Sequence, residues 1–125
     1  MKNNRLRLSS LPKTWIFDID GTLLKHNGYL NGKDELLGGV KDFFDQIPSE
    51  DFILLLTARE KSAEKELKAF LDIHGLRYNQ ILFGIPFGER ILVNDSKPSG
   101  LLTAYAINKP RDAALDIVVT IDETI

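Results

Sequence analysis

Two continuous apolar runs dominate the pattern of hydrophobic and polar positions along the chain. Residues 14–19 (TWIFDI) form the first, shortly after Pro12, and residues 52–56 (FILLL) form the second. Continuous runs of this length, without polar alternation, are typical of parallel strands that are covered on both faces. Three shorter strands are expected further along the chain, at residues 80–83, 91–93 and 103–107.

Two helices are expected from apolar side chains that recur at the spacing of a helix covering a core. The first runs from about residue 39 to 47 and is ended by Pro48. Its apolar stripe consists of Val40, Phe43, Phe44 and Ile47. The second covers about residues 62–74 and ends at Gly75, a residue suited to a left-handed cap. Its apolar face consists of Ala63, Leu67, Phe70 and Leu71.

The order of these elements predicts the fold class. Asn27 and Gly28 lie between short apolar stretches and predict a tight hairpin after the first strand. Strand, hairpin, helix, strand, helix and three short strands favour an α/β domain, a Rossmann-like three-layer sandwich with a mostly parallel sheet. We expect residues 1–125 to form one domain. The β-branched tail, residues 109–125, suits either an edge strand or a strand shared between subunits.

The composition narrows the class of protein. With 125 residues, of which 43% are apolar, the chain can bury one modest core. A formal net charge of −2 gives no indication of a nucleic-acid partner. The absence of cysteine excludes disulfides, thiolate zinc sites and a cysteine nucleophile. Because we find no secretory leader and no apolar run that could cross a bilayer, we expect a cytoplasmic protein without a membrane partner.

The N-terminal arm, residues 1–13, is basic and contains no acidic residue. Its cationic residues are Lys2, Arg5, Arg7 and Lys13. Such an arm suits contact with a phosphorylated partner or with an acidic surface of a neighbouring subunit. The usual behaviour of chain termini favours the other interpretation, a solvated and poorly ordered segment.

Polar groups follow the predicted strands at their carboxyl ends. They are Asp18 and Asp20 at the end of the first run, Thr57 after the second, and Asp95 after residues 91–93. In an open α/β sheet these ends share one rim, where ligands bind. Each residue alone also suits a turn or a helix cap, but their convergence favours a site. Paired carboxylates repel each other and lose hydration, so we expect a positively charged group to hold them.

Three segments resemble motifs of the haloacid dehalogenase (HAD) superfamily. IFDIDGTLL resembles the first motif, apolar residues followed by Asp-x-Asp-Gly-Thr. LLLTAR resembles the second motif, a strand ending in Thr, and ILVND resembles the fourth, a strand ending in an acidic site. The resemblance extends over about residues 15–97 and implies a HAD-like fold and a phosphatase that uses Mg²⁺.

The resemblance also implies roles for single residues. Asp18 would be the nucleophile that accepts a phosphoryl group. Asp20 would be the general acid that protonates the leaving oxygen and later the base that activates water. Mg²⁺ would be held by the Asp18 carboxylate, the Asp20 main-chain carbonyl and Asp95. These roles agree with physical expectation. A hard cation offsets the charge of clustered carboxylates, and an aspartyl-phosphate intermediate divides one difficult displacement into two easier ones. Donors such as the Thr57 hydroxyl stabilise the charge of the phosphoryl group.

The third motif of the superfamily, a Lys or Arg beside the phosphate, is not matched. Ile85 stands where related sequences carry the lysine. Lys97 follows Asp95 on the same rim and is the preferred replacement, since a long ammonium side chain can reach the site. Arg90 is the alternative, although its place at the start of the strand predicted at residues 91–93 puts it on the far side of the sheet.

No segment between the motifs is long enough for the second domain that closes over the substrate in many members, so the resemblance implies a capless enzyme. Lacking a basic face, the chain is not expected to bind nucleic acid. We expect a small phosphorylated metabolite, above all a sugar phosphate, because the arrangement is similar to small phosphatase-like proteins of bacterial surface-polysaccharide (capsule) biosynthesis. A homo-oligomer, in which a neighbouring subunit closes the site, is also compatible with these motifs. Candidate substrate-binding residues are Thr22, Lys25, His26, Lys33, Ala58 and Arg59.

Two other functions are compatible with these motifs. A phospho-acceptor signalling module also gathers acids, a Thr and a Lys at one sheet edge, but it holds its phosphoryl group, whereas Asp20 here offers the proton transfer that fast hydrolysis needs. A catalytically weak homologue that binds phosphate or metal, or serves as a scaffold, is suggested by Ile85. Turnover of simple phosphate esters discriminates between these possibilities, as does stabilisation by metal without turnover.

Overall fold

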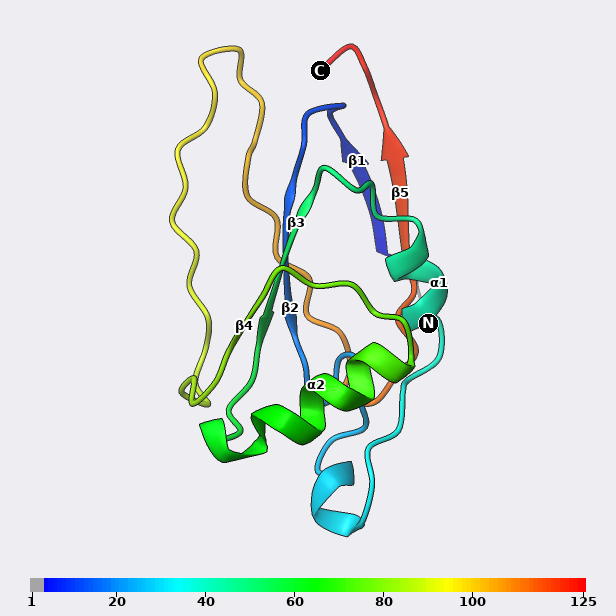
Figure 1. The fold of residues 1–125 in the computed structure, drawn as a ribbon. Helices are drawn as coiled ribbons and strands as arrows, with labels where there is room; N and C mark the ends of the chain where they lie inside the picture. The colour runs from blue at the N-terminus through cyan, green and yellow to red at the C-terminus, as the bar shows by residue number, and fades with distance from the viewer. Residues whose placement is uncertain (1–3) are drawn as a thin grey trace.

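A parallel three-stranded sheet forms the centre of the computed structural model, which describes residues 4–125 (Figure 1). Its strand order is β2 (Thr14–Asp18), β3 (Phe52–Leu56) and β4 (Gln80–Leu82). The register places Asp18 beside Leu56, and Leu56 beside Leu82. The three carboxyl ends therefore lie at one edge of the sheet, as the sequence predicted.

A second, two-stranded sheet joins the two ends of the chain. β1 (Asn4–Leu8) pairs in parallel with β5 (Ile117–Ile121), in a register that runs from Asn4 beside Ile117 to Leu8 beside Ile121. The tail thus supplies an edge strand within its own chain. The favoured prediction of a poorly ordered N-terminal arm is wrong for Asn4–Leu8, because this segment gains a β ladder from the tail; residues 1–3 lie outside the described part.

Both predicted helices are confirmed, with shorter bounds. α1 covers Val40–Asp45. α2 covers Glu64–Ile73 and follows a 3₁₀ turn, η2, at Lys61–Ala63. Their buried residues are Val40, Phe43, Phe44, Leu67 and Leu71.

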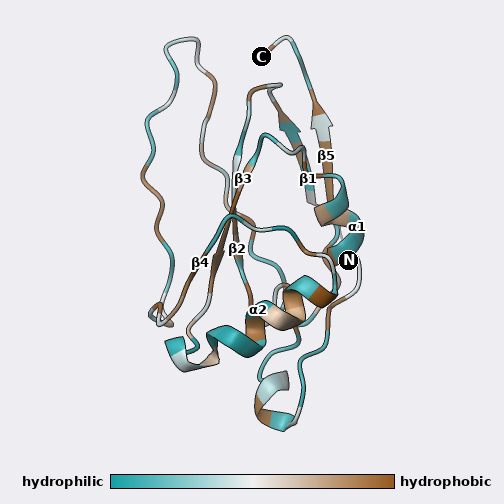
Figure 2. Ribbon diagram, viewed as in Figure 1, coloured by the Kyte–Doolittle hydropathy of each residue, from teal (hydrophilic) through white to brown (hydrophobic). Residues whose placement is uncertain are grey.

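The core lies on one face of the three-stranded sheet. The register puts Phe17, Leu55 and Ile81 on the same face, where they form one cluster with the buried residues of both helices. The apolar run predicted a strand covered on both sides, but Ile16, on the opposite face of β2, is 47% exposed. In Figure 2 β3 is largely brown, whereas teal and brown positions alternate along α2. The described elements therefore give an α/β fold with parallel strands and with helices over one face.

The long segment 83–116 contains no helix and no strand among the described residues. The strands predicted at 91–93 and 103–107 are therefore wrong. Ile91 is 85% exposed and Val93 is 90% exposed, so this short apolar run gains neither burial nor a ladder. Figure 1 shows the segment as an extended excursion beside the sheet, and it turns back where the Gly100 N–H donates to the Lys97 carbonyl at 2.8 Å.

The tight turn predicted at Asn27 and Gly28 is wrong, although the chain does fold back there: Leu24 pairs with Leu36 in an antiparallel bridge, and the Lys25 N–H donates to the Glu35 carbonyl at 2.9 Å. The chain instead forms a 3₁₀ turn, η1, at Gly28–Asn31, and Asn27 takes the left-handed conformation with φ 56°. The Lys33 N–H then donates to the Gly28 carbonyl at 3.2 Å, which closes a short loop. Within residues 4–125 we find no helix with the length and hydrophobicity that a bilayer crossing requires.

Candidate active site at the carboxyl ends of the strands

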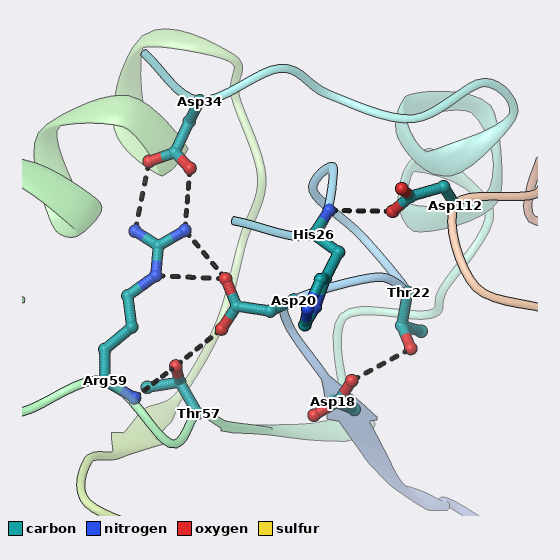
Figure 3. A network of polar contacts seen from close by, with 8 residues as sticks. All are labelled: Asp18, Asp20, Thr22, His26, Asp34, Thr57, Arg59 and Asp112. Carbon is teal, nitrogen blue, oxygen red and sulfur yellow. Dashed lines mark hydrogen bonds and ion pairs between the residues drawn. The ribbon is translucent and has the colours of Figure 1, made fainter. Parts of the chain in front are cut away.

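The ends of β2 and β3 bring together three of the predicted residues. Beyond the ladder, the Ile19 N–H donates to the Leu56 carbonyl at 3.0 Å, which extends the pairing to the segment that carries Asp20. Thr57 is fully buried, and its hydroxyl donates to Asp20 Oδ2 at 2.8 Å (Figure 3). The convergence of Asp18, Asp20 and Thr57 on one rim thus occurs in the structure.

A sharp turn follows Asp20. Gly21 takes φ +86°, a left-handed conformation that costs glycine little. The N–H groups of Thr22, Leu23 and Leu24 then all point at the Ile19 carbonyl, with N···O distances of 3.2, 2.9 and 3.0 Å. This turn carries the Thr22 hydroxyl back to the strand end, where it donates to Asp18 Oδ2 at 3.1 Å.

The Asp18 carboxylate is partly open and has a cationic neighbour. Its side chain is 35% exposed, and its Oδ1 accepts a hydrogen bond from Arg90 Nη1 at 2.8 Å. The expected position of Arg90 on the far side of the sheet is wrong, because residues 83–90 bring it around to the rim instead of starting a strand. Arg90 is therefore the candidate cation that the structure places on Asp18.

Asp20 is held by a buried arginine. Arg59 Nε and Nη2 donate to Asp20 Oδ1 at 3.0 and 2.8 Å. The same guanidinium donates to Asp34 through Nη1 at 3.1 Å and Nη2 at 2.6 Å. The side chains of Arg59, Asp20 and Asp34 are 3%, 17% and 10% exposed, and the Tyr29 ring covers the guanidinium with its centroid 3.9 Å from Cζ.

Burial by itself lowers the pKa of Arg59, but the hydrogen bonds and negative charges of Asp34 and Asp20 together hold that pKa above its ordinary value. The guanidinium is charged at every physiological pH. The sequence predicted Arg59 as a substrate contact, but in the structure its guanidinium is hydrogen-bonded to the carboxylates of Asp20 and Asp34. Asp34 was missed altogether, and the only sequence signal for it is an acid in the segment after the first motif.

Asp95 and Lys97, predicted to join the rim, lie on the long segment instead. Both are exposed, and they line a cavity of about 810 Å³ whose other wall includes Asp18 and Thr22. No group of three or more His, Asp or Glu side chains within residues 4–125 is arranged to hold a metal ion. Asp95 of the fourth motif therefore lines the same cavity as Asp18 of the first motif, but the two do not belong to one metal-binding cluster.

Lys109 lines the same cavity and was not predicted. Burial lowers its pKa, while the negative charges of Asp112 and Asp18 act in the opposite direction. Its ammonium donates to the Pro110 carbonyl at 3.0 Å. No motif in the sequence marks this lysine, since its place beside Asp18 depends on the path of the tail.

The tail also supports the turn after Asp20. The Asp112 N–H donates to the Gly21 carbonyl at 2.9 Å, and Asp112 Oδ1 accepts from the His26 N–H at 2.7 Å (Figure 3). His26 is half-buried and thus joins the support of the site through its main chain. Of the other candidates, Lys25 and Lys33 are exposed and Ala58 is half-buried beside Thr57.

The donor chemistry at this rim fits Mg²⁺ in part. A carboxylate such as Asp18 and main-chain carbonyls are the hard oxygen ligands that Mg²⁺ prefers. Asp18 is open enough to take a cation, whereas the Asp20 carboxylate is already bound by Arg59 and Thr57. Only the main-chain carbonyl of Asp20 is thus a suitable second ligand from this strand end.

Comparison with known proteins returns no match: no protein-family model, no curated protein and no solved structure matches the chain. The resemblance to the HAD superfamily therefore stays a prediction from the motifs. The geometry of the rim is the independent observation on which a function can be argued.

Proposed function

We propose that the chain is a Mg²⁺-dependent phosphomonoesterase of the haloacid dehalogenase type, with a capless domain and Asp18 as the nucleophile. One observation carries the proposal: Asp18 ends the edge strand β2, is partly open, and has Arg90 and Thr22 as donors on its two oxygens. A carboxylate attacking phosphorus needs access and nearby positive charge, because nucleophile and substrate are both anionic.

Asp18 and Asp20 divide the chemistry between them. Asp18 attacks phosphorus and forms an aspartyl-phosphate as the bond to the leaving oxygen breaks. Asp20 protonates that oxygen and then takes a proton from the water that hydrolyses the aspartyl-phosphate. Thr22, through its hydroxyl, and Arg90 would bind the phosphoryl oxygens; both already donate to Asp18.

Mg²⁺ would be held by the Asp18 carboxylate and the Asp20 main-chain carbonyl; Asp95, the third ligand that the resemblance implies, lines the same cavity as Asp18. When bound, the ion would neutralise charge between the carboxylate and the phosphate. Arg90 contributes positive charge at the same place, which compensates for Ile85 at the third-motif position.

For the substrate we propose a small phosphorylated metabolite, with sugar phosphates of surface-polysaccharide biosynthesis as the first class to test. The support is the similarity of the motifs and their arrangement, together with a rim that carries no cap domain. Lys25 and Lys33 are exposed on the loop that follows the first motif and suit contacts with such a substrate.

A panel of sugar and other metabolite phosphates tests the proposal, with free phosphate measured in Mg²⁺ and in chelator. We expect Mg²⁺-dependent release from one or a few esters. Asp18→Asn should lower release by roughly a thousandfold or more, since the nucleophile is lost. Asp45→Asn is the matched control, because Asp45 is an exposed aspartate whose one ion pair within residues 4–125 is with Lys41 on α1, and it should leave the rate unchanged.

Two outcomes would contradict the proposal. Substantial release by Asp18→Asn would remove Asp18 as nucleophile. No release from any ester, with Mg²⁺ still raising the thermal stability of the protein, would favour a metal-binding homologue without turnover. Ile85 at the third-motif position is the observation that makes this second candidate worth testing.

A further inference from the structure

Arg59 joins both ends of the segment between β2 and α1. Asp20 lies at the start of that segment and Asp34 lies near its end, and one guanidinium bonds to both carboxylates. Four hydrogen bonds from three nitrogens fix its plane, and the Tyr29 ring stacks over it. Arg59 therefore has very little freedom of its own.

This rigidity passes to Asp20. Its Oδ1 takes two N–H groups of Arg59, and its Oδ2 takes the Thr57 hydroxyl. Without such contacts, an aspartate side chain samples several χ1 rotamers and a broad range of χ2 angles. Fixing a proton-transfer group in one orientation lowers the entropic part of the barrier, and small misplacements are costly.

Arg59 itself needs a second partner to be fixed. The Thr57 hydroxyl accepts the Arg59 main-chain N–H at 3.1 Å, which sets the backbone but not the end of the side chain. Asp34 takes the outer edge of the guanidinium, and its carboxylate is 10% exposed. A bidentate pair of this kind specifies geometry as well as energy.

We propose that Arg59 and Asp34 are positioning residues: Asp34 fixes the guanidinium of Arg59, and Arg59 fixes the Asp20 carboxylate for proton transfer to the leaving oxygen. This inference rests on the proposed phosphatase function, because it concerns the group that assists departure of the alcohol. The step begins with Asp20 as the neutral carboxylic acid: as the P–O bond breaks, its proton passes to the alcohol oxygen, the phosphoryl group stays on Asp18, and Asp20 is left as the carboxylate that Arg59 and Thr57 hold. Neither Arg59 nor Asp34 touches the reacting atoms.

Arg59→Lys is the main test, because a lysine ammonium cannot bridge two carboxylates in the plane that the guanidinium occupies. Rates are measured on an aryl phosphate with a good leaving group and on an alkyl phosphate with a poor one. We expect kcat on the alkyl ester to fall about ten- to a hundredfold, kcat on the aryl ester to fall less than about threefold, and KM to stay within about threefold for both, since only the poor leaving group needs its proton.

Arg77→Lys is the matched control. Arg77 also uses its guanidinium within the fold, bonding to the carbonyls of Asp51 at 3.1 Å and Pro48 at 3.0 Å, at the opposite end of β3 from the site. Its replacement should lower stability without changing the ratio of aryl to alkyl rates. If Arg59→Lys does not fold, Asp34→Asn serves for the same comparison, because it keeps the shape of the side chain while weakening the pair.

The outcomes separate this inference from the function on which it rests. Suppose that the wild-type protein hydrolyses both esters. If Arg59→Lys then loses rate equally on both, or Asp34→Asn keeps the wild-type ratio of aryl to alkyl rates, the positioning role is overturned and the phosphatase function stands. No hydrolysis of any ester by the wild-type protein would overturn both. A selective loss on the alkyl ester supports the inference.

Discussion

Asp18 and Asp20 are two residues apart in the chain, yet their surroundings differ. Asp18 faces the cavity and pairs with the partly exposed Arg90, whereas Asp20 is directed into a buried cluster with Arg59. Because charge interactions weaken as water gains access, the bond of Arg90 to Asp18 is easily exchanged for a substrate or an ion. The bonds of Arg59 to Asp20 are shielded and hold one geometry. The two carboxylates thus differ in access, and Asp18 is the one that is open to a ligand.

Replacing the candidate cations tests this difference. Arg90→Ala should lower kcat/KM for phosphate release by about ten- to a hundredfold, because it removes a charged donor beside the nucleophile. Lys97→Ala should lower it by less than about threefold, because Lys97 is exposed on the far wall of the cavity. Steady-state kinetics on one ester compares the two directly. A larger loss in Lys97→Ala would show that the long segment closes onto the rim during catalysis.

At the scale of single residues, the sequence predicts which residues stand at the strand ends but not which side chains form hydrogen bonds with them. Asp18, Asp20 and Thr57 could be placed together because the carboxyl ends of neighbouring parallel strands coincide. The partners depend on tertiary structure. Arg59 could equally have pointed at substrate, and its turn toward Asp34 follows from how the segment after β2 folds back.

The elements around the site are locked together by a close main-chain contact. Gly39 precedes α1 and takes φ +79°, and a Cβ at this position would lie 2.4 Å from the Leu115 carbonyl oxygen. The Leu115 N–H in turn donates to the Gly38 carbonyl at 2.8 Å. The start of α1 therefore rests directly on the tail that supports Gly21.

Gly39→Ala should destabilise the protein by about 2–4 kcal/mol, because the left-handed conformation costs about 1–2 kcal/mol for alanine and the clash must be relieved by movement of the tail. Urea unfolding followed by circular dichroism measures the change. Gly32→Ala is the matched control: Gly32 also has a positive φ, +109°, but open space around it, so only the conformational cost should appear. Equal losses in the two variants would mean that the contact with Leu115 is unimportant.

Elements with long apolar patterns were predictable, whereas of the three short strands only the one at residues 80–83 is confirmed, as β4. β2, β3 and both helices each place several apolar side chains in one core, so the pattern decides the structure. The run at 91–93 has only three apolar residues and no second signal. A strand there also needs the open edge of β2, and the structure puts a cavity between the two.

At the scale of the whole molecule, pairing between the chain ends shapes the site. β1 and β5 are more than a hundred residues apart in sequence, and after their ladder the Asp122 N–H donates to the Leu8 carbonyl at 2.7 Å. Such nonlocal pairing leaves no mark in local periodicity, which is why the sequence left the tail open. By returning to β1, the tail carries Lys109 and Asp112 past the turn after Asp20.

The measurement that tests the central claim most directly is the capture of the phosphoryl group on Asp18. Wild-type protein is mixed with an ester that it hydrolyses and with Mg²⁺, quenched in acid and digested with pepsin at low pH, and the peptides that contain Asp18 are analysed by mass spectrometry with fragmentation. We predict an alkali-labile phosphoryl group on Asp18 that is absent in chelator and in Asp18→Asn. Turnover without any phosphorylated peptide, or a label that persists in Asp18→Asn, would contradict the assignment of Asp18 as nucleophile.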